Sequence, residues 1–160
     1  MLKPVLICLC LLAAPAAAAE WKFEGGSTPI AYFDNVHAQF QFACRGGDLA
    51  MAYWVRKPGA EVAAASSLSI AINTSGSAVS SGSDTSFAQD LPVIDSDGSS
   101  VIVRGPVARQ WARLAQGAGD TIHLAFVRTK SNGGLEFLDS QSFGAKGSSA
   151  AIGKVLDRCG

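Results

Sequence analysis

The amino-acid sequence predicts one exported domain made mainly of antiparallel β-strands, a β-sandwich-like domain with two helices. Three observations support this prediction. Several segments alternate apolar and polar residues with a period of two, as half-buried strands do. Two segments, near 106–116 and near 148–158, change to the helical period. The first 19 residues have the pattern of a cleaved signal peptide. The full length of 160 residues suits one domain with a core of its own.

The N-terminal segment reads as a secretory signal. Lys3 precedes the apolar stretch 5–12, and three alanines ending at Ala19 supply the small residues of a cleavage site. The apolar stretch is too short to span a bilayer, so we expect no membrane anchor. We expect cleavage after Ala19, which leaves a single β-rich domain of residues 20–160 in the periplasm or outside the cell.

Cleavage would remove Cys8 and Cys10 and leave Cys44 and Cys159. Two cysteines in an oxidising compartment are expected to pair. Cys44 lies on the apolar face of a predicted strand and Cys159 on the apolar face of the last predicted helix, so their bond would hold that helix against the sheet. The alternative is a catalytic thiol, which would need a histidine poised beside it.

Alternation and short apolar runs mark the strands, at residues 38–45, 49–56, 67–73, 101–104, 121–129 and 135–143. Gly46–Asp48 joins the first two of these as a hairpin, and Lys130–Gly134 joins the last two. We expect about six or seven strands in an antiparallel set. Residues 95–100 read as a further turn.

The first helix is expected to begin at Pro106, whose ring suits a first helical turn, and to end near Gly117. Its expected apolar stripe is Val107, Trp111 and Leu114. In the second helix, Ser148 or Ser149 is the expected N-cap. The buried stripe expected there is Ile152, Val155, Leu156 and Cys159.

The segment 73–86 is rich in Ser and Gly, and its composition predicts a mobile loop, with a binding loop as the alternative. Ser80 and Ser81 within it are candidate recognition residues, together with Trp54. Trp54 lies on the opposite face of its strand from Met51, Tyr53 and Val55. It either contacts a partner or packs under a helix that covers that face. Trp111 is expected in the core.

Several classes of site are excluded. Thirteen basic and thirteen acidic residues give no net charge, which argues against nucleic-acid binding. Asp95 and Asp97 begin a calcium-like loop that lacks its closing glutamate. Gly147–Lys154 has the wrong spacing for a phosphate loop. His37 and His123 read as surface histidines, because neither has a visible nucleophile and orienting acid. We expect no catalytic residue, metal or cofactor.

The C-terminal third resembles a known family. The segment 143–152, running on to Cys159 and Gly160, is a strand, a glycine, an Ala-rich helix and a late cysteine. This ending is similar to that of small exported proteobacterial proteins of the invasion-associated locus B family, and some accessory proteins of type VI secretion end in a similar way. The resemblance implies a periplasmic β-sandwich without catalytic residues that acts through protein contacts at the envelope.

We therefore expect a non-enzymatic accessory protein that binds an envelope or secreted protein. The alternatives are an inhibitor of a protease or lysozyme, which would present a rigid loop, and a binder of small ligands within the sandwich. The identity of the partner and the oligomeric state do not follow from the sequence.

Overall fold

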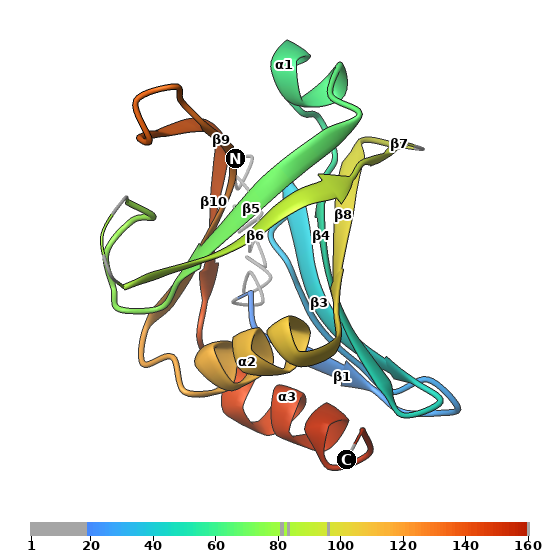
Figure 1. Ribbon diagram of the computed structural model, residues 1–160. Helices are drawn as coiled ribbons and strands as arrows, with labels where there is room; N and C mark the ends of the chain where they lie inside the picture. The colour runs from blue at the N-terminus through green and yellow to red at the C-terminus, as the bar shows by residue number, and fades with distance from the viewer. Residues whose placement is uncertain (1–18, 81, 83, 96, 160) are drawn as a thin grey trace, which may run out of the picture.

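The computed structural model describes residues 19–80, 82, 84–95 and 97–159. They form two antiparallel sheets and three helices (Figure 1). The six-stranded sheet has the order β1 (Lys22–Glu24), β2 (Ile30–Asp34), β3 (Ala38–Arg45), β4 (Asp48–Val55), β8 (Ser99–Arg104) and β7 (Ile94–Asp95). The four-stranded sheet has the order β10 (Leu135–Gly144), β9 (Thr121–Thr129), β5 (Ser67–Asn73) and β6 (Thr85–Pro92). The helices are α1 (Ala60–Ala63), α2 (Gly105–Gln116) and α3 (Ser148–Leu156).

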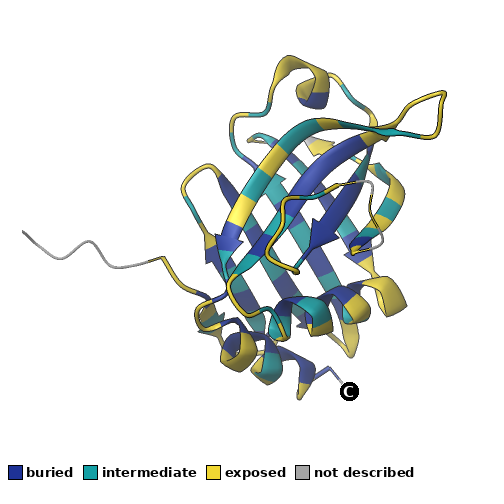
Figure 2. Ribbon diagram, turned by 90° about the vertical axis from the view of Figure 1, so that its left-hand side faces the viewer, coloured by how far each residue is buried: buried dark blue, intermediate teal, exposed yellow. Residues whose placement is uncertain are grey.

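The predicted alternation is present in the two central strands of the six-stranded sheet. Phe40, Phe42 and Cys44 of β3 are buried, and the intervening residues are half-buried. Met51 and Tyr53 of β4 are buried in the same way. Buried and partly exposed residues therefore alternate along these strands (Figure 2), which fixes one inner and one outer face of the sheet.

The two helices α2 and α3 cover the part of the inner face that the four-stranded sheet leaves open. They pack on each other at one end of the molecule (Figure 1), α2 against β4 and β8, and α3 against β1, β2 and β3. Trp111 of α2 is fully buried, as predicted. Of the described helices, α2 and α3 pack on the six-stranded sheet, whereas α1 contacts β10 of the other sheet.

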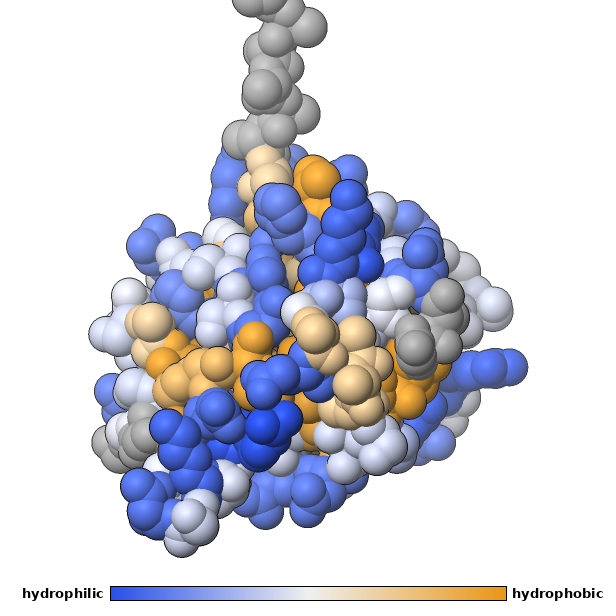
Figure 3. Space-filling view, turned by 90° about the horizontal axis from the view of Figure 1, so that it is seen from above, coloured by the Kyte–Doolittle hydropathy of each residue, from blue (hydrophilic) through white to orange (hydrophobic). Residues whose placement is uncertain are grey.

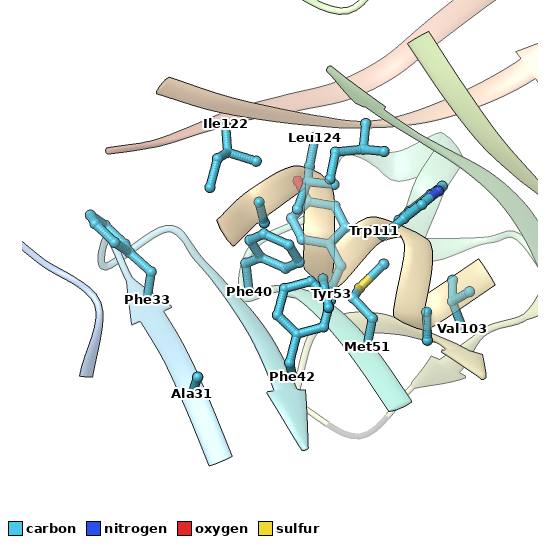
Figure 4. Packing of buried hydrophobic residues seen from close by; sticks show 14 of the residues in the cluster. Ala31, Phe33, Phe40, Phe42, Met51, Tyr53, Val103, Trp111, Ile122 and Leu124 are labelled. Atoms are coloured by element: carbon cyan, nitrogen blue, oxygen red, sulfur yellow. The ribbon is translucent and has the colours of Figure 1, made fainter. Parts of the chain in front are cut away.

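The space between the layers is filled with aromatic and aliphatic side chains. Phe40, Phe42, Met51 and Tyr53 project from the six-stranded sheet toward Ile122 and Leu124 of β9 (Figure 4). The Tyr53 and Phe126 rings lie 4.9 Å apart, centroid to centroid. Because these side chains occupy the space between the sheets, a small ligand would bind at the mouth of the sandwich or on its surface.

The predicted Cys44–Cys159 disulfide is confirmed. It joins β3 to the residues that follow α3 across 115 positions, with the two Cα atoms 5.6 Å apart. Both cysteines are buried. The Arg109 side chain donates to the Cys159 carbonyl oxygen at 2.5 Å, so the C-terminal segment is held by α2 as well.

The β-sandwich class is confirmed, but the sequence analysis missed four strands. β1, β2 and β6 were not predicted, and neither was β7, which begins at Ile94 and ends at the first residue of the segment 95–100 expected to be a turn. β2 escapes detection because both of its faces carry apolar residues. Ala31 and Phe33 point inward, while Ile30 and Tyr32 lie half-buried on the outer side.

Two details of the predicted helices are wrong. Val107 is exposed, and the buried residues of α2 are Ala108, Trp111, Ala112 and Ala115. Small alanines thus let α2 approach the sheet closely. The N-cap of α3 is Gly147, at φ 82°, without a side-chain cap, because Ser148 is itself the buried first residue of the helix. The predicted buried stripe of α3 and the residues after it is confirmed, and it consists of Ile152, Val155, Leu156 and Cys159.

The Ser/Gly-rich segment runs over the outer face of the four-stranded sheet. Val79 packs there on a second, small cluster of Ala71, Ala125 and Val127. The Asn73 side-chain oxygen accepts bonds from the N–H and the hydroxyl of Ser75 at 2.8 and 2.7 Å. The segment was predicted to be a mobile loop from its Ser and Gly content, and the contact that Val79 makes with the sheet was not foreseen.

Residues 1–18, which hold nearly all of the predicted signal peptide with Cys8 and Cys10, lie outside the described residues. Among the helices that are described, none is long and apolar enough to cross a membrane.

Candidate functional site

Trp54 lies on the outer face of the six-stranded sheet, near the end of β4. Its neighbours across the sheet are Gln39 of β3 and Ser100 of β8. No described helix packs on this face, so the expectation that Trp54 packs under a helix is wrong. The partial exposure of its ring comes from strand alternation, which sends Trp54 outward where Tyr53 and Val55 turn inward.

Two contacts fix the Trp54 ring. Its Nε1–H donates to the Asp97 carbonyl oxygen at 2.8 Å. The Arg56 guanidinium lies over the indole, 4.4 Å from the ring centroid, which is a cation–π distance. The ring is therefore held in one orientation before any partner binds.

A hollow of about 410 Å³ lies beside the ring on the outer face. It is lined by Gln39, Gln41, Ala52, Trp54, Asp97, Ser100 and Ile102. Arg56 is not among its lining residues, so the hollow lies away from the guanidinium. The Gln39 amide donates to Gln41 Oε1 at 3.1 Å, which orders the polar side of the hollow.

Arg56 also joins Trp54 to the turn between β2 and β3. Its Nη2 forms an ion pair with the Asp34 carboxylate, and its Nη1 donates to the Val36 carbonyl oxygen at 3.2 Å. Burial alone would raise the pKa of Asp34. The Val36 N–H bond and the Arg56 guanidinium outweigh this effect and lower the pKa below its usual value.

The turn itself holds a strained residue. Val36 has φ 76°, a left-handed conformation that a β-branched residue adopts only at a cost in free energy. Its side chain is 78% exposed. The Asp34 carboxylate accepts from the Val36 N–H at 2.8 Å, and Asn35 Oδ1 accepts from the next two N–H groups, at 3.1 and 2.8 Å. The Asn35 amide also donates to the Ser142 carbonyl oxygen of β10 at 3.2 Å.

A crevice of about 310 Å³ opens beside this turn, between the end of β4 and the edge strand β10. It is lined by Val36, His37, Val55, Arg56, Lys57, Asp139 and Gln141. Seen from the end of the molecule that carries α1, apolar and hydrophilic side chains lie side by side (Figure 3). This end of the molecule thus offers both apolar and polar contacts.

The Tyr53 hydroxyl lies behind the crevice. It is buried and lies beside the Asp139 carboxylate, which lines the crevice. Burial raises the pKa of Tyr53 well above its usual value, and the Asp139 charge raises it further. Tyr53 itself does not line the crevice, so Asp139 is the acidic group that the crevice presents.

The structure separates the three residues proposed for recognition. Trp54 lies on the outer face of one sheet, and Ser80 lies in the loop that crosses the outer face of the other. Ser80 N–H donates to Thr85 Oγ1 at 3.4 Å. Ser81 lies outside the described residues. Trp54 and Ser80 therefore do not share a site.

Cys44 is disulfide-bonded and therefore carries no free thiol for a histidine to activate. His37 is exposed beside the crevice. His123 Nδ1 lies 2.9 Å from Ser142 Oγ of the neighbouring strand. Among the described contacts, no carboxylate bonds the other His123 nitrogen. The residues that are described also contain no cluster of three metal-ligating side chains.

Sequence reasoning missed the turn, the crevice and the buried phenol. Asp34 and Asn35 are good turn residues, and this pair was the signal available for the turn. The strain at Val36 has no sequence signal, since most positions of that kind hold Gly or Asn. Tyr53, Asp139 and Gln141 meet only because β10 lies beside β4 across the mouth of the sandwich.

A scan against protein-family models finds no matching family, and a search of curated proteins finds no match. Among solved structures, the chain is similar to the crystal structure of invasion associated protein B from Bartonella henselae. The TM-score is 0.49 at 10% sequence identity, over 86% of this chain and 97% of that one. The sequence resemblance was to the same family. The likeness concerns the fold, and no functional residue is transferred from it.

Proposed function

We propose that the chain is a non-enzymatic accessory protein of the periplasm or cell exterior that binds another protein. The contact surface is the Val36–Trp54 surface, defined as the turn Asp34–His37 with Trp54 and Arg56. Val36 supports this proposal most strongly, because a strained and exposed valine gains nothing from packing within the domain.

The cost of this valine can be bounded. A non-glycine residue in the left-handed region costs on the order of 1–3 kcal/mol. Glycine or asparagine would close the turn more cheaply. The exposed apolar side chain at this position offsets that cost when a partner buries it, because burial of apolar surface is favourable.

The rigidity of the surface favours binding. Arg56 contacts both Trp54 and the turn, so the aromatic and aliphatic contacts are fixed relative to each other. Preorganisation lowers the entropic cost of association. Trp and Arg are also enriched among the residues that dominate binding energies in protein interfaces.

The chemistry of the surface defines the partner. Val36 requires an apolar recess, and Lys57 and His37 beside it favour acidic side chains around that recess. Lys57 makes no ion pair with any described residue, so its charge is free for a partner. The partner is therefore an envelope or secreted protein with an apolar, acid-rimmed recess.

Site-specific photo-cross-linking tests this function. A photoreactive amino acid is placed at position 36 or 54, or at position 90 as the control, in the full chain expressed in its own cells. Asp90 is the matched control, since it is exposed and also has a positive φ, of 51°, but lies in the other sheet. We expect one protein cross-linked from positions 36 and 54 and absent from position 90. Equal capture from all three positions, or none, would refute the proposal.

A periplasmic inhibitor of a hydrolase is the second candidate, because a turn braced by Asp34, Asn35 and Arg56 resembles a presented inhibitory loop in its rigidity. A panel of proteases and lysozymes separates the two functions. Inhibition at micromolar concentration that is lost in Val36→Asn would assign the inhibitor, and no inhibition would leave the accessory function.

A further inference from the structure

The outer face of the six-stranded sheet carries a groove that runs along β4. The hollow beside Trp54 adjoins a second hollow of about 290 Å³, because both are lined by Gln41, Ala52 and Ile102. These three residues form one row across β3, β4 and β8. The two hollows together are called the outer groove. It extends along β4 from Trp54 to Asp48, six positions apart, which is about 20 Å of strand.

Small side chains keep the outer groove open. Ala50 and Ala52 form its floor, and Ala52 lies between the longer side chains of Gln41 and Ile102. The simplest explanation of such a face is a solvated outer surface, which accounts for its polar side chains. It does not account for Trp54, a large ring fixed by two contacts at the end of a floor of alanines, which are themselves depleted in strands. The shape therefore indicates a site for a ligand.

The Trp54 end of the groove offers an apolar ring surface beside amide groups. Trp54 Nε1–H already donates to the Asp97 carbonyl oxygen, so the indole presents only apolar surface to the groove. The bond from Gln39 Nε2 to Gln41 Oε1 leaves Gln39 Oε1 and the Gln41 amide N–H groups without a partner among the described residues. Hydrogen-bond donors and acceptors thus lie next to the ring.

The other end of the groove carries positive charge. Arg45 and Arg104 line it, and neither forms an ion pair with a described residue. Asp48, opposite Arg45 in the sheet, is the one carboxylate that lines this end. Two guanidinium groups against one carboxylate leave a net positive charge, and guanidinium binds carboxylates in bidentate pairs. Asp97 lines the Trp54 end, so an acidic ligand would place its charge toward Arg45 and Arg104.

The groove offers side chains to a ligand and few backbone groups. β3 and β4 are interior strands, so their backbone groups bond to neighbouring strands on both sides. A peptide that binds as an added strand needs a free sheet edge instead. A lipid, or any purely apolar ligand, would bury the glutamine amides without partners. The groove therefore suits a ligand with hydrogen-bonding groups along its length, an apolar face for the indole and a negative charge.

We infer that the outer groove binds an acidic oligosaccharide, with one sugar ring against Trp54 and a uronate carboxylate at Arg45 and Arg104. Sugar hydroxyls donate and accept hydrogen bonds, as the amides do, and the C–H groups on a ring face pack against an indole. The hollow beside Trp54, about 410 Å³, lies within the range for ligand sites, roughly 300–1,000 Å³. The inference goes beyond the proposed protein contact and does not depend on it. That contact includes Arg56, which does not line the groove.

Binding is measured with the chain purified after expression of the full sequence. An array of uronate-containing and neutral oligosaccharides is screened first. Calorimetry follows on the strongest acidic binder, for example a hyaluronan tetrasaccharide, and on its carboxyl-reduced derivative, which lacks only the charge. We expect the acidic form to bind at least about tenfold more tightly, and this advantage should shrink at high salt. Equal binding of the two forms, or no binding of any oligosaccharide on the array, would overturn the inference.

Variants identify the site. Arg104→Gln should weaken binding of the acidic form about tenfold or more and leave binding of its carboxyl-reduced derivative unchanged. Gln41→Leu should weaken binding of both forms, because it removes an amide that both use. Arg128→Gln and Gln89→Leu are the matched controls, since both residues lie in the other sheet. Unchanged affinity in both Arg104→Gln and Gln41→Leu would place the ligand elsewhere and overturn the inference.

A protein ligand on the same face is separated by cross-linking. A photoreactive amino acid at position 41 should capture no protein, and specific capture of one would assign the groove to a protein contact and overturn the inference. Cross-linking from position 36 should persist in Arg104→Gln. Loss of oligosaccharide binding and loss of the proposed protein partner are therefore distinguishable results.

Discussion

Gly98 shows how one residue holds Trp54 in place. A Cβ atom at Gly98 would lie 2.2 Å from the Val55 carbonyl oxygen and 2.8 Å from Trp54 Nε1, and its φ is +108°. Only glycine permits the turn between β7 and β8 to approach the indole this closely. The bond from Trp54 to the Asp97 carbonyl oxygen depends on that approach.

Gly98→Ala is therefore expected to destabilise the domain by about 3 kcal/mol or more, through overpacking and backbone strain together. Gly26→Ala is the control, since Gly26 has φ +122° but no atom within 4 Å of the added Cβ. It should cost only the backbone strain, about 1–2 kcal/mol. Urea unfolding of both variants measures the difference. Equal losses of unfolding free energy would show that the close approach of Gly98 to Trp54 and Val55 does not contribute to stability.

For Tyr53 we expect the opposite effect: the substitution Tyr53→Phe should raise the stability of the domain. Tyr53→Phe removes a buried hydroxyl without a partner, so the free energy of unfolding should rise by about 1 kcal/mol. Tyr32→Phe is the control, because the Tyr32 hydroxyl is bonded to Glu24 at 2.9 Å on the surface and its loss should change little. A loss of stability in Tyr53→Phe would mean that the hydroxyl has a partner within the folded chain.

The raised pKa of Tyr53 also predicts a pH dependence. An unfolded tyrosine ionises near pH 10, whereas the folded one keeps its proton to higher pH because its charge would be buried. Stability is therefore fully present below about pH 10 and falls as the pH rises toward the folded pKa. Tyr53→Phe should lose less stability than the wild-type chain between neutral pH and pH 11. Parallel curves for the two proteins would contradict this.

At the scale of elements, helix α3 depends on the disulfide. Cys159 follows α3, and its bond to Cys44 closes a loop of 115 positions. On the chain-entropy model, a loop of this size stabilises the domain by about 4–5 kcal/mol.

Cys44→Ala with Cys159→Ala should therefore lower the free energy of unfolding by about 4–5 kcal/mol. Hydrogen exchange should rise first in α3, which contacts α2 and the first three strands but carries no other covalent link. The wild-type chain under reducing conditions is the control and should behave alike. Unchanged exchange in α3 would show that packing of Ile152 and Val155 holds the helix without the bond.

A strand or helix could be predicted from the sequence when its buried face is apolar and its exposed face is polar. β3 was predicted to the residue because glutamines alternate with buried aromatics. β2 was missed because Ile30 and Tyr32 make its outer face apolar as well. The stripe on α3 was found, whereas Val107 of α2 was placed on the wrong face because alanines form the actual contact.

At the scale of the whole molecule, the sequence predicted the sandwich and the disulfide but not the candidate sites. Trp54 was singled out from strand alternation alone. The crevice could not be, because Val55 comes from β4 and Asp139 and Gln141 come from β10, and these two strands meet only in the packed sheets. Such a site depends on the relative placement of two layers, on which local periodicity carries no information.

The measurement that tests the account most directly is a paired one on Val36→Asn. Asparagine tolerates the left-handed backbone, so the free energy of unfolding should rise by about 0.5–1 kcal/mol. Removal of the exposed apolar group should at the same time reduce partner cross-linking from position 54 about tenfold. Asp90→Asn should change neither quantity. The account would be contradicted if the Val36→Asn variant were more stable and still gave the same cross-linking yield as the wild-type chain. The strained valine would then make no contact with the partner.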